Sequence, residues 1–202
     1  MARTPKIVAN RRQQIIDTAL RLFAQKGFTR TTNKDIAQAA GITPGLIYHY
    51  FASKEALLKA IIDRLSPVQV FRSLSPEMLA LPPEPLLRLV MQQMLAMVED
   101  EPFVQLIHIF LSEVIHTPSL APLGLASLQE ATQTLEAYLA TKMESGELRR
   151  ADPAAVVQVL MGSGMGLILR RQILRDPTAL HYSHAQIVDS IVTTILQGLL
   201  PR

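Results

Sequence analysis

The chain has 202 residues, of which 49% are hydrophobic and 18% charged, so it should fold as one domain or two small ones rather than stay disordered. It contains no cysteine, which excludes disulfide scaffolds, thiol catalysis and cysteine-ligated metal centres. Residues 1–55 carry nine Lys or Arg against three Asp or Glu, and residues 56–202 carry eleven against fourteen, which indicates either a basic end that meets a polyanion or a scattered solvated surface.

The first predicted helix spans residues 12–26. Its apolar residues follow the i, i+3, i+4, i+7 spacing of one buried face: Ile16, Ala19, Leu20 and Phe23. Lys26 places a cation in the last turn, and Gly27 is the residue type at which helices commonly end. The composition agrees with this, because Leu, Ala, Ile and Met dominate and aromatic residues make up only 5% of the chain.

Two short helices are expected next, joined by a turn at Gly41. Thr32 can cap the first of them, and Asp35 favours its positive N-terminal end. Thr43 can cap the second, with Pro44 at the first helical position, where a missing N–H costs little. One face of this second helix, within about 140°, is small and polar, and it comprises Pro44, Gly45, Tyr48 and His49. Its other side is apolar and comprises Ile47 and Phe51.

A fourth helix is expected to begin after Ser53, which can serve as its N-cap. Lys54 then lies in the first turn, where the helix dipole disfavours a cation. A cation at this position is understandable if a phosphate comes close to the helix end. Two short helices joined by a glycine turn, beside a basic segment, indicate a helix-turn-helix.

Residues 12–58 resemble the N-terminal domain of TetR-family (tetracycline-repressor-like) transcriptional regulators. The resemblance is carried by Gly27-Phe28, Thr31-Thr32, Asp35-Ile36-Ala37, Ala40-Gly41-Ile42, Ile47-Tyr48-His49-Tyr50-Phe51 and Ser53-Lys54-Glu55-Ala56-Leu57. It implies an all-α protein with two domains. A three-helix DNA-binding domain would span residues 9–69, with its helix-turn-helix at about 32–51, and a helical ligand-binding and dimerisation bundle would span residues 70–202.

The resemblance also implies roles for residues of the first domain. The start of the recognition helix would lie near base edges and comprises Thr43, Pro44, Gly45 and Leu46. Phosphate contacts would come from Tyr48, His49 and Lys54, helped by Thr31, Thr32, Arg11 and Arg12. Leu46 departs from the small or hydroxyl residue that is frequent in the family, and it either contacts a thymine methyl or packs inward.

Further helices without a strand pattern are expected along the body of the chain. The fourth helix continues to about Leu65, and further helices are placed at residues 85–98, 102–115, 125–144, 153–174 and 183–200. A proline-rich rigid connector is expected at 75–85 and a break between Pro118 and Pro122. The first residues of the chain lack the apolar stretch of a signal peptide, so a soluble, cytoplasmic protein is expected.

The stretch from Pro153 to Leu169 is uncharged. A membrane span is one interpretation, but the stretch reaches only about 25 Å, which is short of the roughly 30 Å of a bilayer core. A buried helix that allows close helix–helix approach is preferred, and no membrane partner is expected. By resemblance, this helix and the last one form a four-helix interface in a homodimer, for which the candidate residues are Gly162, Gly166, Ile191 and Ile195.

A set of methionines and polar or aromatic residues is either ordinary core or the lining of an apolar effector pocket. The candidates are Met91, Met94, Met97, Met161 and Met165, together with His108, Phe110 and His116. Histidines without carboxylates at ligand spacing do not indicate a metal site, and no nucleophile elbow, phosphate loop or zinc-protease motif occurs in the sequence. No cofactor and no catalytic residue is therefore expected.

These observations together predict a homodimeric regulator that binds double-stranded DNA at a palindromic operator. A small hydrophobic or amphipathic effector would bind in the body and release the DNA, which makes a repressor the expected class. The alternative is an architectural or partner-regulated DNA-binding protein that lacks a small-molecule switch.

Overall fold

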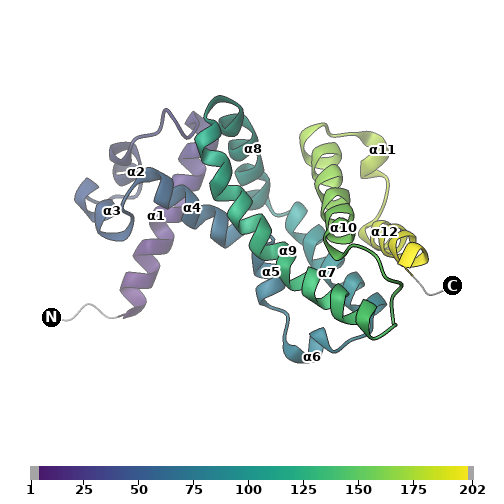
Figure 1. Ribbon diagram of the computed structural model, residues 1–202. Coiled ribbons are helices and arrows are strands. Elements are labelled where there is room, and N and C mark those ends of the chain that lie inside the picture. The colour runs from purple at the N-terminus through teal and green to yellow at the C-terminus, as the bar shows by residue number, and fades with distance from the viewer. Residues whose placement is uncertain (1–4, 200–202) are drawn as a thin grey trace. The chain divides into compact units, whose positions relative to one another are not determined.

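The computed structural model describes residues 5–199, and the side chains of residues 11–97 and 99–199. Helices form all of the regular structure in this described part, and no strand occurs in it (Figure 1). The expected all-α fold is therefore confirmed.

The chain divides into two compact units, and each unit is built from two separate segments. Unit 1 comprises Met1–Leu65 and Glu101–Ala126, and unit 2 comprises Ser66–Asp100 and Ser127–Arg202. The domains expected from the sequence, at residues 9–69 and 70–202, stay a prediction, because a compact unit and a functional domain are different divisions of a chain.

Unit 1 contains the helix-turn-helix. Its elements are α1 (Pro5–Lys26), α2 (Asn33–Ala39), α3 (Pro44–Tyr50), α4 (Lys54–Leu65), α8 (Glu101–His116), the short 3-10 helix η1 (Pro118–Leu120) and the beginning of α9 (Ala121–Glu144). In Figure 1, α2 and α3 lie together beside α1, and the packing of α1 on α2 and of α2 on α3 agrees with this view.

The apolar face predicted for the first helix is the centre of the unit 1 core. Ile16 and Ala19 are completely buried there, and Phe23 stacks edge-on against Phe28 with ring centroids 5.1 Å apart. Leu106 and Ile109 bring the inner face of α8 into the same core. The core of unit 1 therefore depends on a helix, α8, that is separated from α4 by 35 residues of the chain.

The local start and stop signals of the sequence are mostly confirmed. The Thr32 side chain accepts from the Asp35 backbone while Asp35 accepts from the Thr32 backbone, which forms a capping box. Hydrogen bonds from Thr32 to the Asp35 carboxylate lower its pKa. Ser53 caps α4 by accepting from the Ala56 N–H at 3.1 Å. Thr43 occupies the N-cap position of α3, but its side chain makes no capping hydrogen bond.

Unit 2 is a helical bundle. Its elements are α5 (Val68–Arg72), α6 (Pro76–Leu79), α7 (Pro83–Val98), the longer part of α9, α10 (Pro153–Ile168), the π-helical turn η2 (Leu169–Ile173), α11 (Pro177–Leu180) and α12 (His184–Leu199). Helix α7 packs on α12 and on α10. Arg88 reinforces the first of these contacts, because its Nη2 lies 2.9 Å from Asp189 Oδ1 on α12.

Residues 75–85 differ from the rigid connector that the prolines suggest. Ser75 accepts from the Met78 N–H at 3.3 Å, and Pro76 stands at the first position of a short helix, α6. The break expected between Pro118 and Pro122 is also shorter than predicted, because η1 leads directly into α9 at Ala121. Proline supports a helix start at both places, since its fixed φ suits the first turn.

Candidate functional site

Helix α3 has the two faces that its sequence predicts. Ile47 and Phe51 are buried in the unit 1 core, with 1% and 4% of their surfaces exposed. The opposite face is open to solvent and comprises Thr43, Pro44, Gly45, Tyr48 and His49. Leu46 is half-buried between the two faces. The first turns of α3 can therefore approach a groove of DNA without any change in the core.

The two arginines of α1 named by the sequence are exposed. Arg11 Nη1 donates to Gln14 Oε1 at 2.7 Å on the same helix. The guanidinium of Arg12 lies 5.2 Å from the centre of the Phe51 ring, which follows the end of α3. This contact places a cation of α1 next to the end of the exposed helix.

Lys54 is held by the turn between α1 and α2. Its Nζ donates to the carbonyl oxygens of Phe28, Thr31 and Thr29 at 2.8, 3.0 and 3.2 Å. The ammonium also lies 4.4 Å from the centre of the Phe28 ring. An ammonium has three donors, so these carbonyls account for a cation in the first turn of α4. A phosphate contact by Lys54 stays a prediction, and it requires one of these donors to be shared.

The two threonines expected near phosphates lie in different surroundings. Thr31 is completely buried, and its hydroxyl donates to the Gly27 carbonyl at 2.7 Å. A side chain without exposed surface cannot meet a phosphate, so the expected help from Thr31 does not fit this placement, and we assign the residue to the turn instead. Thr32 is exposed at the N-cap of α2.

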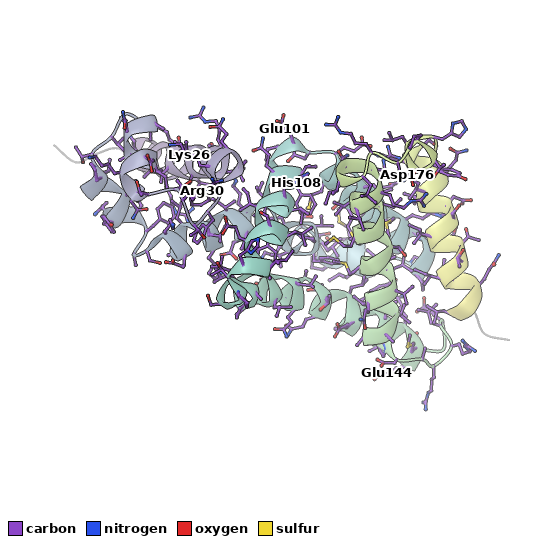
Figure 2. The ribbon with its side chains drawn as sticks, turned by 90° about the horizontal axis from the view of Figure 1, so that it is seen from above. Lys26, Arg30, Glu101, His108, Glu144 and Asp176 are labelled. Carbon is purple, nitrogen blue, oxygen red and sulfur yellow. The ribbon has the colours of Figure 1, made fainter. Side chains whose placement is uncertain are left out.

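Further cations that were not among the expected DNA contacts lie at this end of unit 1. Lys34 is exposed in the first turn of α2. Lys26 and Arg30 lie near each other in Figure 2, and Arg30 Nε donates to the Lys26 carbonyl at 2.8 Å. Lys26 also faces Asp35 at 3.5 Å. Their clustering depends on how the turn folds, and sequence spacing alone does not reveal it.

Glu113 of α8 reaches the same turn. Its Oε2 accepts from the Thr29 hydroxyl at 2.7 Å, and its Oε1 accepts from the Thr29 N–H at 3.4 Å. The pairing joins residues that lie 84 positions apart in the chain. Sequence reasoning missed it because no local pattern marks such a partner.

The eight residues considered as an effector pocket do not form one site. Met91, Met94, Met97 and Met161 belong to the unit 2 core or pack against it, and Met165 is 48% exposed. His108, Phe110 and His116 lie on α8 in unit 1 (His108 is labelled in Figure 2). The two groups therefore lie in separate units.

Each unit carries an open cavity. The cavity of unit 1 has a volume of about 850 Å³ and lies between the end of α1 and α8, where its walls include Arg30, His108, Glu113 and His116. The cavity of unit 2 has a volume of about 370 Å³, and its walls are Pro82, Pro83, Glu84, Glu147, Leu148, Thr193, Leu196 and Gln197. None of the five methionines contributes to either wall.

Helix α10 presents an apolar stripe to solvent. Val159 on α10 is 59% exposed, and Leu169 at the start of η2 is 45% exposed. A Cβ added at Gly162 or Gly166 would meet no other atom within 4 Å. On α12, Ile191 and Ile195 are half-buried and pack against the unit 2 core. Helix α10 is thus less buried within one copy of the chain than the sequence suggested.

The same helix is the one candidate for a membrane span in the described part of the chain. Pro153–Ile173 is long and apolar enough by length and composition, and 22% of its apolar window is buried. Length and composition are weak evidence, because helices that pack against one another in soluble proteins have the same character. Among the described residues, no group of three His, Asp or Glu could hold a metal ion.

Comparison with known proteins agrees with this geometry. Residues 15–61 match the family described as "Bacterial regulatory proteins, tetR family", and residues 85–198 match the "AefR-like transcriptional repressor, C-terminal domain". The HTH-type transcriptional repressor KstR2 of Rhodococcus jostii is 46% identical over 54 residues, which are 27% of this chain and 26% of that relative. The matched stretch therefore spans about a quarter of that relative's length.

Solved structures share the fold over almost the whole chain. GusR of Salmonella enterica is 25% identical with a TM-score of 0.73, covering 93% of this chain and 96% of its own. A complex of SmeT with triclosan is 23% identical with a TM-score of 0.76, covering 95% of this chain and 92% of its own. With a matching N-terminal model and a C-terminal model that alone covers more than half of the chain, the protein belongs to the TetR family of bacterial transcriptional regulators.

Proposed function

We propose that the protein is a cytoplasmic, homodimeric repressor that binds a palindromic DNA operator through α3 and is released by a small apolar or amphipathic effector. The observation that carries the DNA-binding part is the exposed small and polar face of α3, whose opposite apolar face is buried in the unit 1 core. This helix lies within the basic segment 1–55. Thr43, Pro44, Gly45 and Leu46 are assigned to base edges, whereas Tyr48, His49, Thr32, Arg11, Arg12 and Lys54 are assigned to phosphates.

Dimerisation is assigned to α10 and α12. The exposed stripe of α10 with Gly162 and Gly166 offers a surface on which a second helix can approach closely. A two-fold dimer would present its two α3 helices to successive major grooves, about 34–36 Å apart on one side of the duplex. The operator would then carry two inverted half-sites.

The first experiment is selection of bound sequences from a random duplex library, followed by affinity measurements at two salt concentrations. A palindrome with two half-sites supports the proposal. Binding without sequence preference that falls steeply with salt contradicts it, because phosphate contacts alone behave in that way. A Leu46→Ala variant that keeps the sequence preference would in turn rule out the thymine-methyl contact of that side chain.

The effector part rests on the methionine-rich core of unit 2, since methionine side chains can repack around an apolar guest. The triclosan complex of SmeT, a protein of similar fold, supports an apolar effector class. Release of the selected duplex by at least one compound from a panel of apolar and amphipathic molecules is the expected result. By linkage, the DNA must weaken binding of that compound by the same factor.

A second candidate keeps the DNA binding and omits the small-molecule switch. It is favoured by the close packing around the methionines, since Met91 is completely buried and a Cβ on Gly164 would lie 3.3 Å from Met94 Cε. Unchanged DNA affinity with every compound of the panel, and release by a protein partner instead, would select this candidate.

A further inference from the structure

The turn at residues 27–31, which joins α1 to α2, is fixed from several sides. Gly27 has a φ of +84°, which an L side chain rarely adopts, and its N–H closes α1 on the Phe23 carbonyl. Thr31 fills the interior of the turn with its hydroxyl on the Gly27 carbonyl. The Lys54 ammonium donates hydrogen bonds to three carbonyl oxygens of the same segment. These contacts come from the turn itself and from the adjacent helices α1 and α4.

Glu113 of α8 supplies a further contact to the turn, from a residue 84 positions away in the chain. Both of its carboxylate oxygens accept hydrogen bonds from Thr29. It also lies so close to the turn that a Cβ added at Gly27 would be 3.0 Å from its Oε1. Glu113 is half-buried as a residue, whereas Thr29 is exposed, so solvent reaches the bond between them. We call this pairing the Thr29–Glu113 bridge.

The turn leads without interruption into the exposed helices. Thr32, the N-cap of α2, follows the last carbonyl that Lys54 holds. Helix α2 packs on both α1 and α3. A shift of the turn would therefore move the start of α2 and change the direction in which α3 faces. We infer that Glu113 is a positioning residue for operator recognition, and that it acts through Thr29 by fixing the 27–31 turn.

The inference rests on the proposed function, because it concerns the orientation in which α3 presents its side chains to the base edges. Base contacts need a fixed helix orientation, whereas phosphate contacts by flexible side chains tolerate small shifts. Loss of the bridge should therefore weaken binding to a specific duplex much more than binding to unrelated DNA. A general loss of stability would weaken both.

The test uses Thr29→Val, which removes the hydroxyl and keeps the branched shape, against Thr29→Ser, which keeps the hydroxyl. Glu113→Ala and the double variant Thr29→Val with Glu113→Ala complete the set. The two DNA probes are the duplex recovered by selection and poly(dI-dC). A thermal melt of each variant checks that it remains folded.

Thr29→Val and Glu113→Ala should each weaken binding to the selected duplex by roughly 3- to 10-fold, the effect of losing one solvent-exposed hydrogen bond of ordinary net strength. Binding to poly(dI-dC) should change less than about twofold. Thr29→Ser should match the unaltered protein, and the double variant should lose no more than either single variant. Unchanged affinity in Thr29→Val, equal losses on both DNAs, or additive losses would overturn the inference.

Amide hydrogen exchange separates this inference from the proposed function. If the unaltered protein selects no duplex, the proposed function fails, and the bridge can still be tested on the protein alone. Faster exchange at the amides of residues 32–36 in Thr29→Val than in Thr29→Ser is then the expected result. Identical exchange in the two variants would overturn the positioning role. If the protein selects a duplex and both variants bind it equally, only the inference fails.

Discussion

Phe110 packs its ring against the backbone of Gly124, and a Cβ added at Gly124 would lie at or within 3.0 Å of three atoms of that ring. Real Cβ atoms do not approach a ring so closely, so this glycine is required by the packing of α8 on the beginning of α9. The relationship also accounts for Phe110, which the sequence suggested as a pocket residue and which packs against the unit 1 core.

Gly124→Ala should therefore destabilise the protein. Overpacking a core costs about 1–3 kcal/mol, and the better helix propensity of alanine returns about 1 kcal/mol, so the net loss should be about 1 kcal/mol. A chemical denaturation curve measures it. Gly198→Ala on α12 is the matched control, because a Cβ there meets no atom within 4 Å. A destabilisation by Gly198→Ala as large as that by Gly124→Ala would contradict this explanation.

Asp176 should make the stability of unit 2 depend on pH in the acid range. Hydrogen bonds from Thr178 and Arg170 lower the pKa of Asp176 from 3.8 to about 2. Because the folded pKa is depressed, this contribution is complete above the unfolded pKa and is lost as the pH falls from about 4 to about 2.

Asp176→Asn should be less stable than the unaltered protein near neutral pH, and the difference should shrink through that same window. Thermal melts between pH 2 and pH 6 measure it. A difference that stays constant over the whole range would show that the carboxylate does not carry the effect.

If α10 forms the proposed dimer interface, Val159→Arg should convert the dimer into a monomer without unfolding it. Val159 is 59% exposed on the apolar stripe of α10, so a charge there would be buried only when two copies associate through this helix. Sedimentation velocity measures the mass, and circular dichroism confirms that the helices persist. Gln133→Arg, at an exposed position on α9, should leave the mass unchanged. A dimer that persists in Val159→Arg would place the interface elsewhere.

Arg11→Ala and Arg12→Ala should weaken DNA binding to a similar extent on every sequence. If these side chains contact phosphates, each variant should reduce the slope of log affinity against log salt by about one. Fluorescence anisotropy at several salt concentrations measures the slope. Arg150→Ala removes the same charge from an exposed position in unit 2 and serves as the control. A changed sequence preference in Arg12→Ala would instead indicate a base contact.

The elements near the helix-turn-helix could be predicted because their signals are local. The capping box of Thr32 and Asp35, the Ser53 cap and the end of α1 at Gly27 each involve residues no more than four positions apart. Hydrogen bonds of this range are decided by residue type and spacing, which the sequence displays directly. The short helix α6 has the same kind of signal, with Ser75 before Pro76, but four prolines nearby suggested a connector instead.

The long-range contacts of the candidate site could not be read in the same way. Lys54 has carbonyl partners 23 to 26 positions earlier in the chain, and the helix dipole argument pointed to a phosphate because it considers only the helix on which the cation lies. His108 and Phe110 were grouped with the methionines by chemical type, whereas the fold places α8 in the other unit. Which core a helix joins is a property of the whole chain.

The division of unit 1 into two segments has a consequence for synthesis of the protein. Its core includes Leu106, Ile109 and Leu120, which lie beyond the whole first segment of unit 2 in the sequence. Unit 1 cannot complete its core while the ribosome has made only α1 to α4. More than half of the chain, up to Leu120, must be translated first. An interrupted polypeptide that stops before α8 would carry α3 on an incomplete core, so translation through at least Leu120 is required before the core of unit 1 is complete.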